Sequence, residues 1–125
     1  MNPRTAKKKR LGLGSHLSVA GGVSKAIEAA IELDVVSLQI FTKNASRWQQ
    51  KPTDPDEVDR FKERREAWGA YPIVSHDSYL INLASPDEAL WKRSTAAFED
   101  ELQRAELLGL DFLVMHPGAH VGSGQ

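Results

Sequence analysis

Histidine recurs at corresponding places along this 125-residue chain. His16, His76 and His116 each follow a segment with the pattern of a short strand. Neutral imidazole is a common ligand of Zn²⁺ and similar cations, so histidines at neighbouring strand ends can converge on one ion. A single histidine in such a place is more often a hydrogen-bonded structural group. The three together favour a metal site.

The metal site predicted from these histidines is incomplete. Catalytic zinc typically takes three protein ligands, commonly including a carboxylate, and Asp77 is the carboxylate that accompanies the histidines. His120 lies four residues after His116, a spacing that serves one ion only on a helix. Pro117 and Gly118 favour a turn instead. We therefore expect His120 to be a loop residue near the site.

Two other kinds of active site are excluded by missing motifs. Asp77, Ser78 and a histidine would make a catalytic triad on paper, but the chain has no G-x-S-x-G elbow to expose the serine. No G-x-G-x-x-G follows the first predicted strand, and residues 20–22 are interpreted as a turn into a helix. We expect no nucleotide cofactor. The absence of cysteine also excludes thiolate zinc sites and cysteine nucleophiles.

A second set of residues has the chemistry of nucleic-acid contacts. Lys43 and Arg47 are cationic, Asn44 carries an amide, and Trp48 and Tyr79 are aromatic. This mixture suits contacts to phosphates combined with stacking on bases or wedging between them. Trp48 has an equally weighted alternative, which is to pack as a lid over the top of a sheet.

The elements that must position these residues alternate between strand and helix. Runs of β-branched and other apolar residues predict strands at residues 10–16, 35–41, 71–75 and 111–115. A helical apolar stripe begins at Val23. Asp54 before Pro55 is typical of the start of a second helix.

A third helix is predicted after a capping box formed by residues 85–88, with Ser85 at its start. Gly109 stands where a left-handed residue commonly ends a helix. The predicted buried stripe of this helix consists of Leu90, Ala97, Phe98, Leu102, Ala105 and Leu108.

Alternation of apolar strands with helices is typical of an α/β fold with a parallel sheet. Four such strands fit half of a (β/α)₈ barrel or a small doubly wound sheet, and the pattern alone leaves both open. In either architecture functional residues gather at the carboxyl ends of the strands. The histidines, and residues 42–44 after the second strand, occupy those ends.

Composition places the chain among globular proteins, with 41% hydrophobic and 26% charged residues. The first ten residues hold five of the 16 basic side chains and no acidic one, which leaves a formal charge of −6 on the rest. We expect residues 1–10 to be a disordered basic tail. No apolar run reaches the length of a membrane span, and no secretory signal pattern is present. We expect no membrane contact and a cytoplasmic location.

Several motifs resemble those of a known family. They are GSHLSVAGG at residues 14–22, FTKN followed by Trp48, HDSYLINL at 76–83, LQRAELLGL at 102–110 and HPGAH at 116–120. In this order, over about residues 11–120, they resemble the N-terminal part of endonuclease IV, the bacterial-type apurinic/apyrimidinic endonuclease.

The resemblance implies a (β/α)₈ TIM barrel that holds three zinc ions. It implies hydrolysis of the phosphodiester 5′ to an abasic site in double-stranded DNA, a step of base excision DNA repair. His76 and His116 correspond to ligands of one zinc, and His16 to a nearby histidine that is not a ligand. Tyr79 and residues 43–48 match segments that enter DNA around the abasic nucleotide.

The chain departs from the family pattern in two respects. Arg47 directly precedes Trp48, so the identity of the side chain that wedges into DNA is left open. The family's remaining metal ligands lie on strands after the fourth, so we expect residues 11–125 to be the N-terminal half of a barrel that is inactive alone. The alternatives are a metal-dependent sugar isomerase or epimerase of the same architecture and a half-barrel without catalytic activity.

Overall fold

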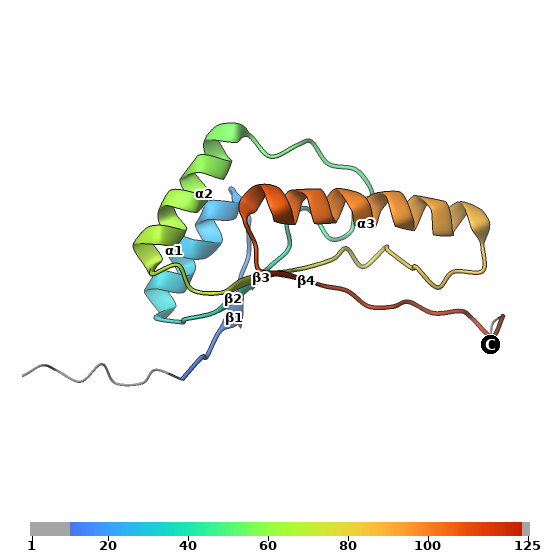
Figure 1. Cartoon of the computed structure of the whole chain (residues 1–125), viewed down its shortest axis with the longest axis horizontal. Helices are drawn as coiled ribbons and strands as arrows, with labels where there is room; N and C mark the ends of the chain where they lie inside the picture. The colour runs from blue at the N-terminus through green and yellow to red at the C-terminus, as the bar shows by residue number, and fades with distance from the viewer. Residues whose placement is uncertain (1–10, 124–125) are drawn as a thin grey trace, which may run out of the picture.

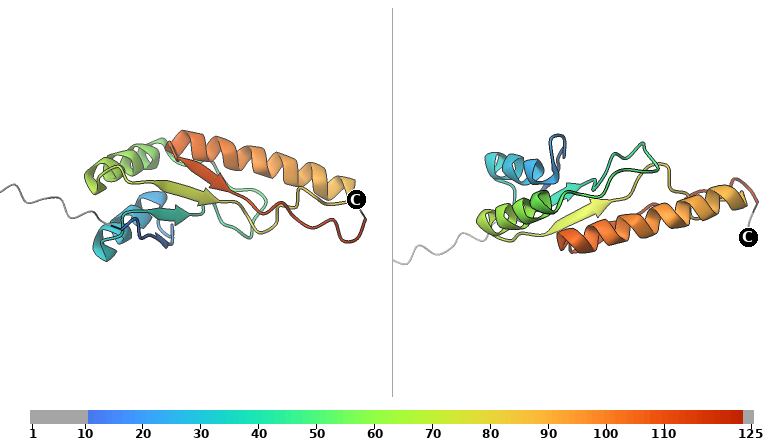
Figure 2. Two further views of the ribbon diagram at one scale, coloured as in Figure 1. Left: turned by 60° about the horizontal axis from the view of Figure 1, so that its bottom comes forward. Right: turned by 90° about the horizontal axis from the view of Figure 1, so that it is seen from above.

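Within residues 11–123, four parallel strands form one sheet in chain order (Figure 1). The computed structural model describes residues 11–123, so the predicted tail at residues 1–10 lies outside the described residues. The strands are β1 (Ser15–His16), β2 (Leu38–Ile40), β3 (Ile73–His76) and β4 (Phe112–Val114). Consecutive strands pair in parallel, and Figure 2 shows the arrows of β2, β3 and β4 running side by side in one direction. All four predicted strands are confirmed, although each differs from its predicted bounds by a few residues.

In the described part of the chain, three helices connect these strands and lie on one side of the sheet (Figure 1). They are α1 (Val23–Leu33), α2 (Pro55–Trp68) and α3 (Glu88–Leu108). Each one carries the chain from the carboxyl end of one strand back to the start of the next, as parallel pairing requires. Within residues 11–123 no helix has the length and apolarity needed to cross a membrane.

Burial alternates along the strands and separates two faces of the sheet. Leu38, Ile40 and Ile73 are buried, whereas Gln39 and Val74 between them are only half-buried. The buried positions pack with α1 and α2 in the hydrophobic core, which includes Ile27, Ala30, Val58, Phe61, Trp68 and Leu108. His76 shares the other face with Val74 by strand alternation, and His16 is paired with Gln39 on that face. This face has no helix over it among residues 11–123 (Figure 2).

Helix boundaries follow the local capping chemistry. The Asp54 carboxylate accepts the Asp56 N–H at 2.8 Å with Pro55 at the first helical position, which confirms the predicted start of α2. The predicted start of α3 is wrong: its N-cap is Asp87, whose Oδ1 accepts the Leu90 N–H at 2.7 Å. Ser85 instead accepts the Asp87 N–H in a local turn, which places the cap two residues later. Gly109 ends the helix in the left-handed conformation, as predicted.

The buried face of α3 differs from the predicted apolar stripe. Ala97, Ala105 and Leu108 are buried as predicted, but Leu102 is 47% exposed. Glu101 and Arg104 are buried in its place, because specific polar partners on the loops of the sheet receive them. The buried face of α3 therefore contacts the loop after β2 through ionic and hydrogen-bonding groups as well as through apolar side chains.

Asp111 fixes the start of β4 against β3. Its carboxylate accepts the Ile73 N–H at 2.9 Å and a bond from the Arg65 guanidinium at 2.6 Å, while its own N–H donates to the Ile73 carbonyl. The pKa of Asp111 lies below its ordinary value, first because of the Ile73 N–H bond and further because of Arg65, against an opposing effect of burial. Arg65 also bonds the carbonyls of Tyr71 and Gly109, so it joins α2 to both strand entries.

We predict that Asp111→Asn lowers the free energy of unfolding by about 1 kcal/mol at pH 7, the usual net value of one hydrogen bond. The ion pair adds little because the Asp111 side chain is 39% exposed and solvent screens it. A depressed folded-state pKa gives stability that is complete above the unfolded pKa and is lost as pH falls through the folded pKa. Urea unfolding at pH 7 and in acid should therefore show the deficit of the variant shrinking in acid. Asp59→Asn, on the exposed face of α2, is the control, and an equal deficit at both pH values would contradict the assignment.

Candidate functional site

Two predicted metal ligands lie together at the carboxyl end of the sheet. His76 is the last residue of β3, and His116 follows β4 by two residues. The centroids of their rings are 5.0 Å apart, with the ring planes inclined by 51°. A cavity borders His116, and its lining also includes Asp77 and Tyr79. The parallel register brings the two side chains together although they are 40 positions apart in the sequence.

One nitrogen of His76 is already committed to a hydrogen bond. Its Nδ1 lies 2.8 Å from the carbonyl oxygen of Asp77. A carbonyl oxygen only accepts, so Nδ1 carries the proton in this contact and Nε2 of the neutral ring keeps its lone pair. Metal-binding histidines commonly use one nitrogen in this way to set the orientation of the other.

The Asp77 carboxylate lies next to the histidine pair and is almost fully buried. One of its oxygens is 3.5 Å from His76 Nδ1, and the other, Oδ2, is buried without a hydrogen-bond partner among residues 11–123. Burial raises the pKa of Asp77, while the charges of His76 and His116 act in the opposite direction. The structure thus places Asp77 beside the pair, as the sequence predicts.

His16 lies near the pair but is engaged elsewhere. Its Nδ1 accepts a hydrogen bond from the Gln39 side chain at 2.8 Å. Its ring is 4.7 Å from that of Phe41, which in turn lies 5.8 Å from His76 and 5.3 Å from Tyr79. Burial lowers the pKa of His16, and the neighbouring His76 lowers it further. Phe41 is therefore the shared packing partner of two rim histidines and one predicted DNA-contacting tyrosine.

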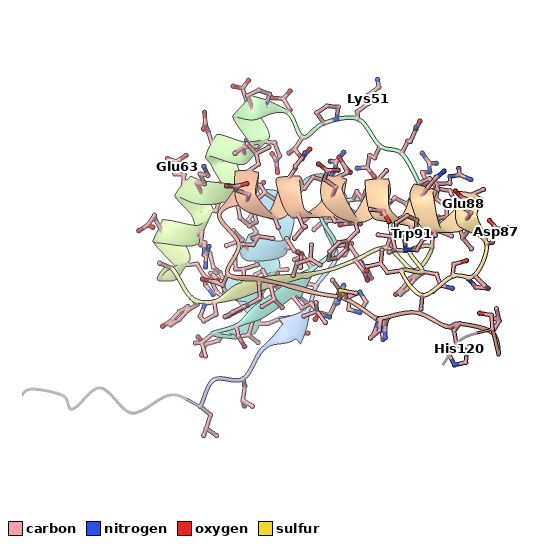
Figure 3. All side chains as sticks on the ribbon, turned by 45° about the vertical axis from the view of Figure 1, so that its right-hand side comes forward. Lys51, Glu63, Asp87, Glu88, Trp91 and His120 are labelled. Carbon is pink, nitrogen blue, oxygen red and sulfur yellow. The ribbon has the colours of Figure 1, made fainter. Side chains whose placement is uncertain are left out.

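The fourth histidine lies apart from the pair. His120 is exposed, and Figure 3 shows it at the far end of the extended C-terminal segment. Its Nδ1 accepts the Gly122 N–H at 3.0 Å, which closes a local turn. Among residues 11–123, no group of three or more histidine, aspartate or glutamate side chains is arranged to hold a metal ion. Within this range, His76 and His116 are therefore the side chains placed to supply two nitrogen ligands to one ion.

Asn82 holds the segment that follows His116. Its Oδ1 accepts the N–H groups of Ala84 and Ala119, and its Nδ2 donates to the Ala119 carbonyl. A Cβ atom on Gly118, at φ +100°, would collide with the Asn82 side chain. The close approach thus requires glycine. The role of Asn82 was not predicted from the sequence, because nothing near this amide in the sequence indicates a partner 37 positions away.

The predicted DNA-contacting set divides into exposed and packed residues. Asn44 and Arg47 are exposed, and Tyr79 is 72% exposed. Trp48 is half-buried, with the Arg93 guanidinium of α3 stacked 4.4 Å from its ring centroid. Beside this contact, a cavity lies between α3 and the loop formed by residues 48–51. The structure therefore places Trp48 against α3 and not over the top of the sheet, and its two predicted roles stay predictions.

Lys43 requires a correction, because its ammonium group is not available to a phosphate. The side chain is 1% exposed. Its Nζ donates to the Trp48 carbonyl at 3.2 Å and lies 3.4 Å from Asp100 and 3.9 Å from Glu101. A lysine in a polar loop usually faces water, so nothing near Lys43 in the sequence indicates acidic partners on α3.

The chain matches a family model described as a xylose isomerase-like TIM barrel over residues 27–125. It is 46% identical over 112 residues to "Probable endonuclease 4" of Chloroflexus aurantiacus and 41% identical to its namesake in Halothermothrix orenii. These alignments cover 90% of this chain but only 39% and 40% of the relatives. The crystal structure of endonuclease IV from Thermus thermophilus superposes with a TM-score of 0.81 at 42% identity, covering 86% of this chain and 40% of that one. The chain thus spans about two-fifths of the length of these proteins.

We predict that Phe41→Leu disturbs His16, His76 and Tyr79 together, because all three rings pack on Phe41. The loss of these ring contacts should lower the free energy of unfolding by about 1 kcal/mol. NMR should show shifts of the ring protons of both histidines. Phe112→Leu is the matched control, since Phe112 is 69% exposed on β4. Equal histidine shifts in the two variants would contradict the assignment of Phe41 as the shared packing partner.

Proposed function

The chain belongs to the xylose isomerase-like TIM-barrel family, and from its similarity to the endonuclease 4 proteins we propose that it carries the N-terminal part of a zinc-dependent apurinic/apyrimidinic endonuclease. The proposed substrate is double-stranded DNA with an abasic site, and the proposed reaction hydrolyses the phosphodiester 5′ to that site in base excision repair. The proposed location of this reaction is the cytoplasm. The observation that carries the proposal is the His76–His116 pair, with ring centroids 5.0 Å apart at the end of the sheet.

The histidine pair fits two nitrogen ligands of one zinc ion. The bond from His76 Nδ1 to the Asp77 carbonyl leaves the lone pair on Nε2, and the ring of His116 lies next to this imidazole. Imidazole nitrogen is a preferred zinc ligand. When bound, zinc supplies Lewis-acid polarisation of a phosphodiester and activation of water as a nucleophile. The Asp77 carboxylate lies beside this site, with Oδ1 3.5 Å from His76 Nδ1.

The contacts to DNA are assigned to the exposed residues of the same end of the sheet. Arg47 carries a charge suited to a phosphate, and Asn44 a hydrogen-bonding amide. Tyr79 stands only three residues after His76 and presents an exposed ring that suits stacking or wedging. An abasic nucleotide lacks the stacking of its base, so extruding it costs less than extruding a paired one. This difference contributes to selectivity for abasic sites.

A metal-dependent sugar isomerase is the second candidate, because the family description itself refers to xylose isomerase. A small-sugar pocket has no use for the exposed ring of Tyr79 or for Arg47. The similarity to endonuclease IV at 42% identity also favours the nuclease. Turnover of an abasic duplex against turnover of an aldose or ketose separates the two functions.

We further propose that the 125-residue chain does not cleave DNA alone. Catalytic zinc typically requires three protein ligands. The described residues offer the histidine pair and no group of three. In the complete enzyme, the other ligands would come from the part of the barrel that lies beyond the two-fifths matched here.

We predict weak zinc binding by the chain itself, carried by the histidine pair. His76→Ala and His116→Ala should each lower the affinity for Zn²⁺ by at least about tenfold, because one remaining imidazole is a poor site. Isothermal titration with zinc chloride measures this. His120→Ala, at the exposed C-terminal turn, is the matched control and should leave the affinity unchanged. Equal losses in all three variants would show that zinc binds histidines nonspecifically.

We predict zinc-dependent cleavage by a chimera of this chain and the unmatched C-terminal part of the Chloroflexus relative. It should cut a duplex with one tetrahydrofuran abasic analogue on the 5′ side, and a chelator should stop the reaction. His76→Ala with His116→Ala should reduce the rate by more than about 100-fold, while Glu99→Gln on the exposed face of α3 should leave it unchanged. Gel electrophoresis of end-labelled strands measures the products. A chimera that folds and binds zinc but leaves the abasic duplex intact would refute the proposed function.

A further inference from the structure

A buried carboxylate on α3 joins two loops at the carboxyl end of the sheet. We propose that Glu101 is a positioning residue that holds the loop after β2 and the loop after β3 in the arrangement needed for contact with DNA. The structural part of this inference stands on the hydrogen bonds of Glu101. Its consequence for DNA rests on the proposed function.

The two oxygens of Glu101 bind one loop each. Oε2 accepts the hydroxyl of Thr42 at 3.0 Å, and Oε1 accepts the backbone N–H of Ser78 at 3.1 Å. Thr42 lies two residues after the end of β2, and Ser78 lies two residues after the end of β3. The carboxylate therefore bridges equivalent positions of neighbouring βα units. All three residues are buried.

The two loops are also joined directly. The Ser78 hydroxyl donates to the Ala45 carbonyl at 2.6 Å, and the Tyr79 N–H donates to the same oxygen at 3.1 Å. Ala45 lies between Asn44 and Arg47, two of the residues proposed to contact DNA. A shift of Ser78 would therefore move Tyr79 and the loop after β2 together. Glu101 fixes this link between the two loops to α3, because its carboxylate accepts the Ser78 N–H.

Lys43 balances the charge of this buried group. Its Nζ lies 3.9 Å from Glu101 Oε1 and 3.4 Å from Asp100, and it also donates to the Trp48 carbonyl. Removal of one member leaves a buried charge unpaired and strongly destabilises a fold, whereas replacement of both by apolar residues is often tolerated. A single substitution of Glu101 would thus mix loss of positioning with loss of stability.

Two charge-balanced double variants separate these effects. Lys43→Met with Glu101→Leu removes both charges and the hydrogen bonds to the loops. Lys43→Met with Glu101→Gln removes the same charges but keeps an oxygen for the Ser78 N–H and an amide that can donate to the Thr42 hydroxyl. The two variants differ only at residue 101. Glu99→Gln, which removes an exposed charge from the same helix, controls for charge alone.

Amide hydrogen exchange measures the positioning without reference to DNA. In the leucine variant, the N–H groups of Ser78, Tyr79 and Arg47 should exchange at least about tenfold faster, relative to core amides such as Leu38 and Val58, than in the glutamine variant. The glutamine variant should resemble the unmodified chain. Equal loop exchange in the leucine and glutamine variants would overturn the inference, because the hydrogen bonds of residue 101 would then be irrelevant to loop order.

Binding to a duplex with one tetrahydrofuran analogue, compared with the same duplex undamaged, tests the consequence for DNA. The leucine variant should lose at least about tenfold in affinity for the abasic duplex, and the glutamine variant should retain it. Loosened loops with unchanged affinity would overturn the role of Glu101 in DNA contact. If the unmodified chain does not prefer the abasic duplex, the proposed function loses support, and the exchange comparison still decides whether Glu101 positions the loops.

Discussion

The register of the four parallel strands is the constraint on which the site depends. Parallel pairing places Ser75 of β3 beside Leu113 of β4 and His76 beside Val114. His116 therefore emerges next to His76 at the same end of the sheet. Because side chains alternate between faces, a shift of one residue in this pairing would turn His76 toward the helices and separate the two rings. Asp111 and Arg65 hold this register at the opposite end, where both strands begin.

Aromatic and polar contacts around the histidines stabilise different parts of the site. Phe41 packs against His16, His76 and Tyr79, so it fixes ring positions without directional bonds. Glu101 and Asn82 act on backbone groups of the loops and so fix where the chain runs. Rigid elements with supporting side chains hold a functional geometry more accurately than loops alone. Here each loop that carries a proposed functional residue is joined to a neighbouring element.

The features that depend on local chemistry were predictable from the sequence. Apolar runs located all four strands, and Asp54 and Gly109 marked helix ends because capping is satisfied within a few residues. His76 and His116 were also expected at one end of the sheet, since parallel strands share their direction. The N-cap of α3 is Asp87 and not the predicted Ser85. Both side chains can accept a bond from the local backbone, so the sequence alone does not show which of them caps the helix. The resemblance to endonuclease IV was confirmed by independent similarity in sequence and fold.

Features that depend on distant partners were not predictable in this way. Lys43 and Glu101 are 58 positions apart, and each alone has the pattern of a solvated charge. Their burial follows from the way α3 crosses the loops of the sheet, which no local pattern encodes. The same crossing leaves the side chains of Asn44 and Arg47 exposed while the backbone beneath them is held at Ala45. Asn44 Oδ1 still accepts the N–H and the hydroxyl of Ser46, so this side chain shapes the loop. Arg47 is therefore the position where a new side chain would disturb the loop least, which makes it the better choice for altering the surface of this end of the sheet by design.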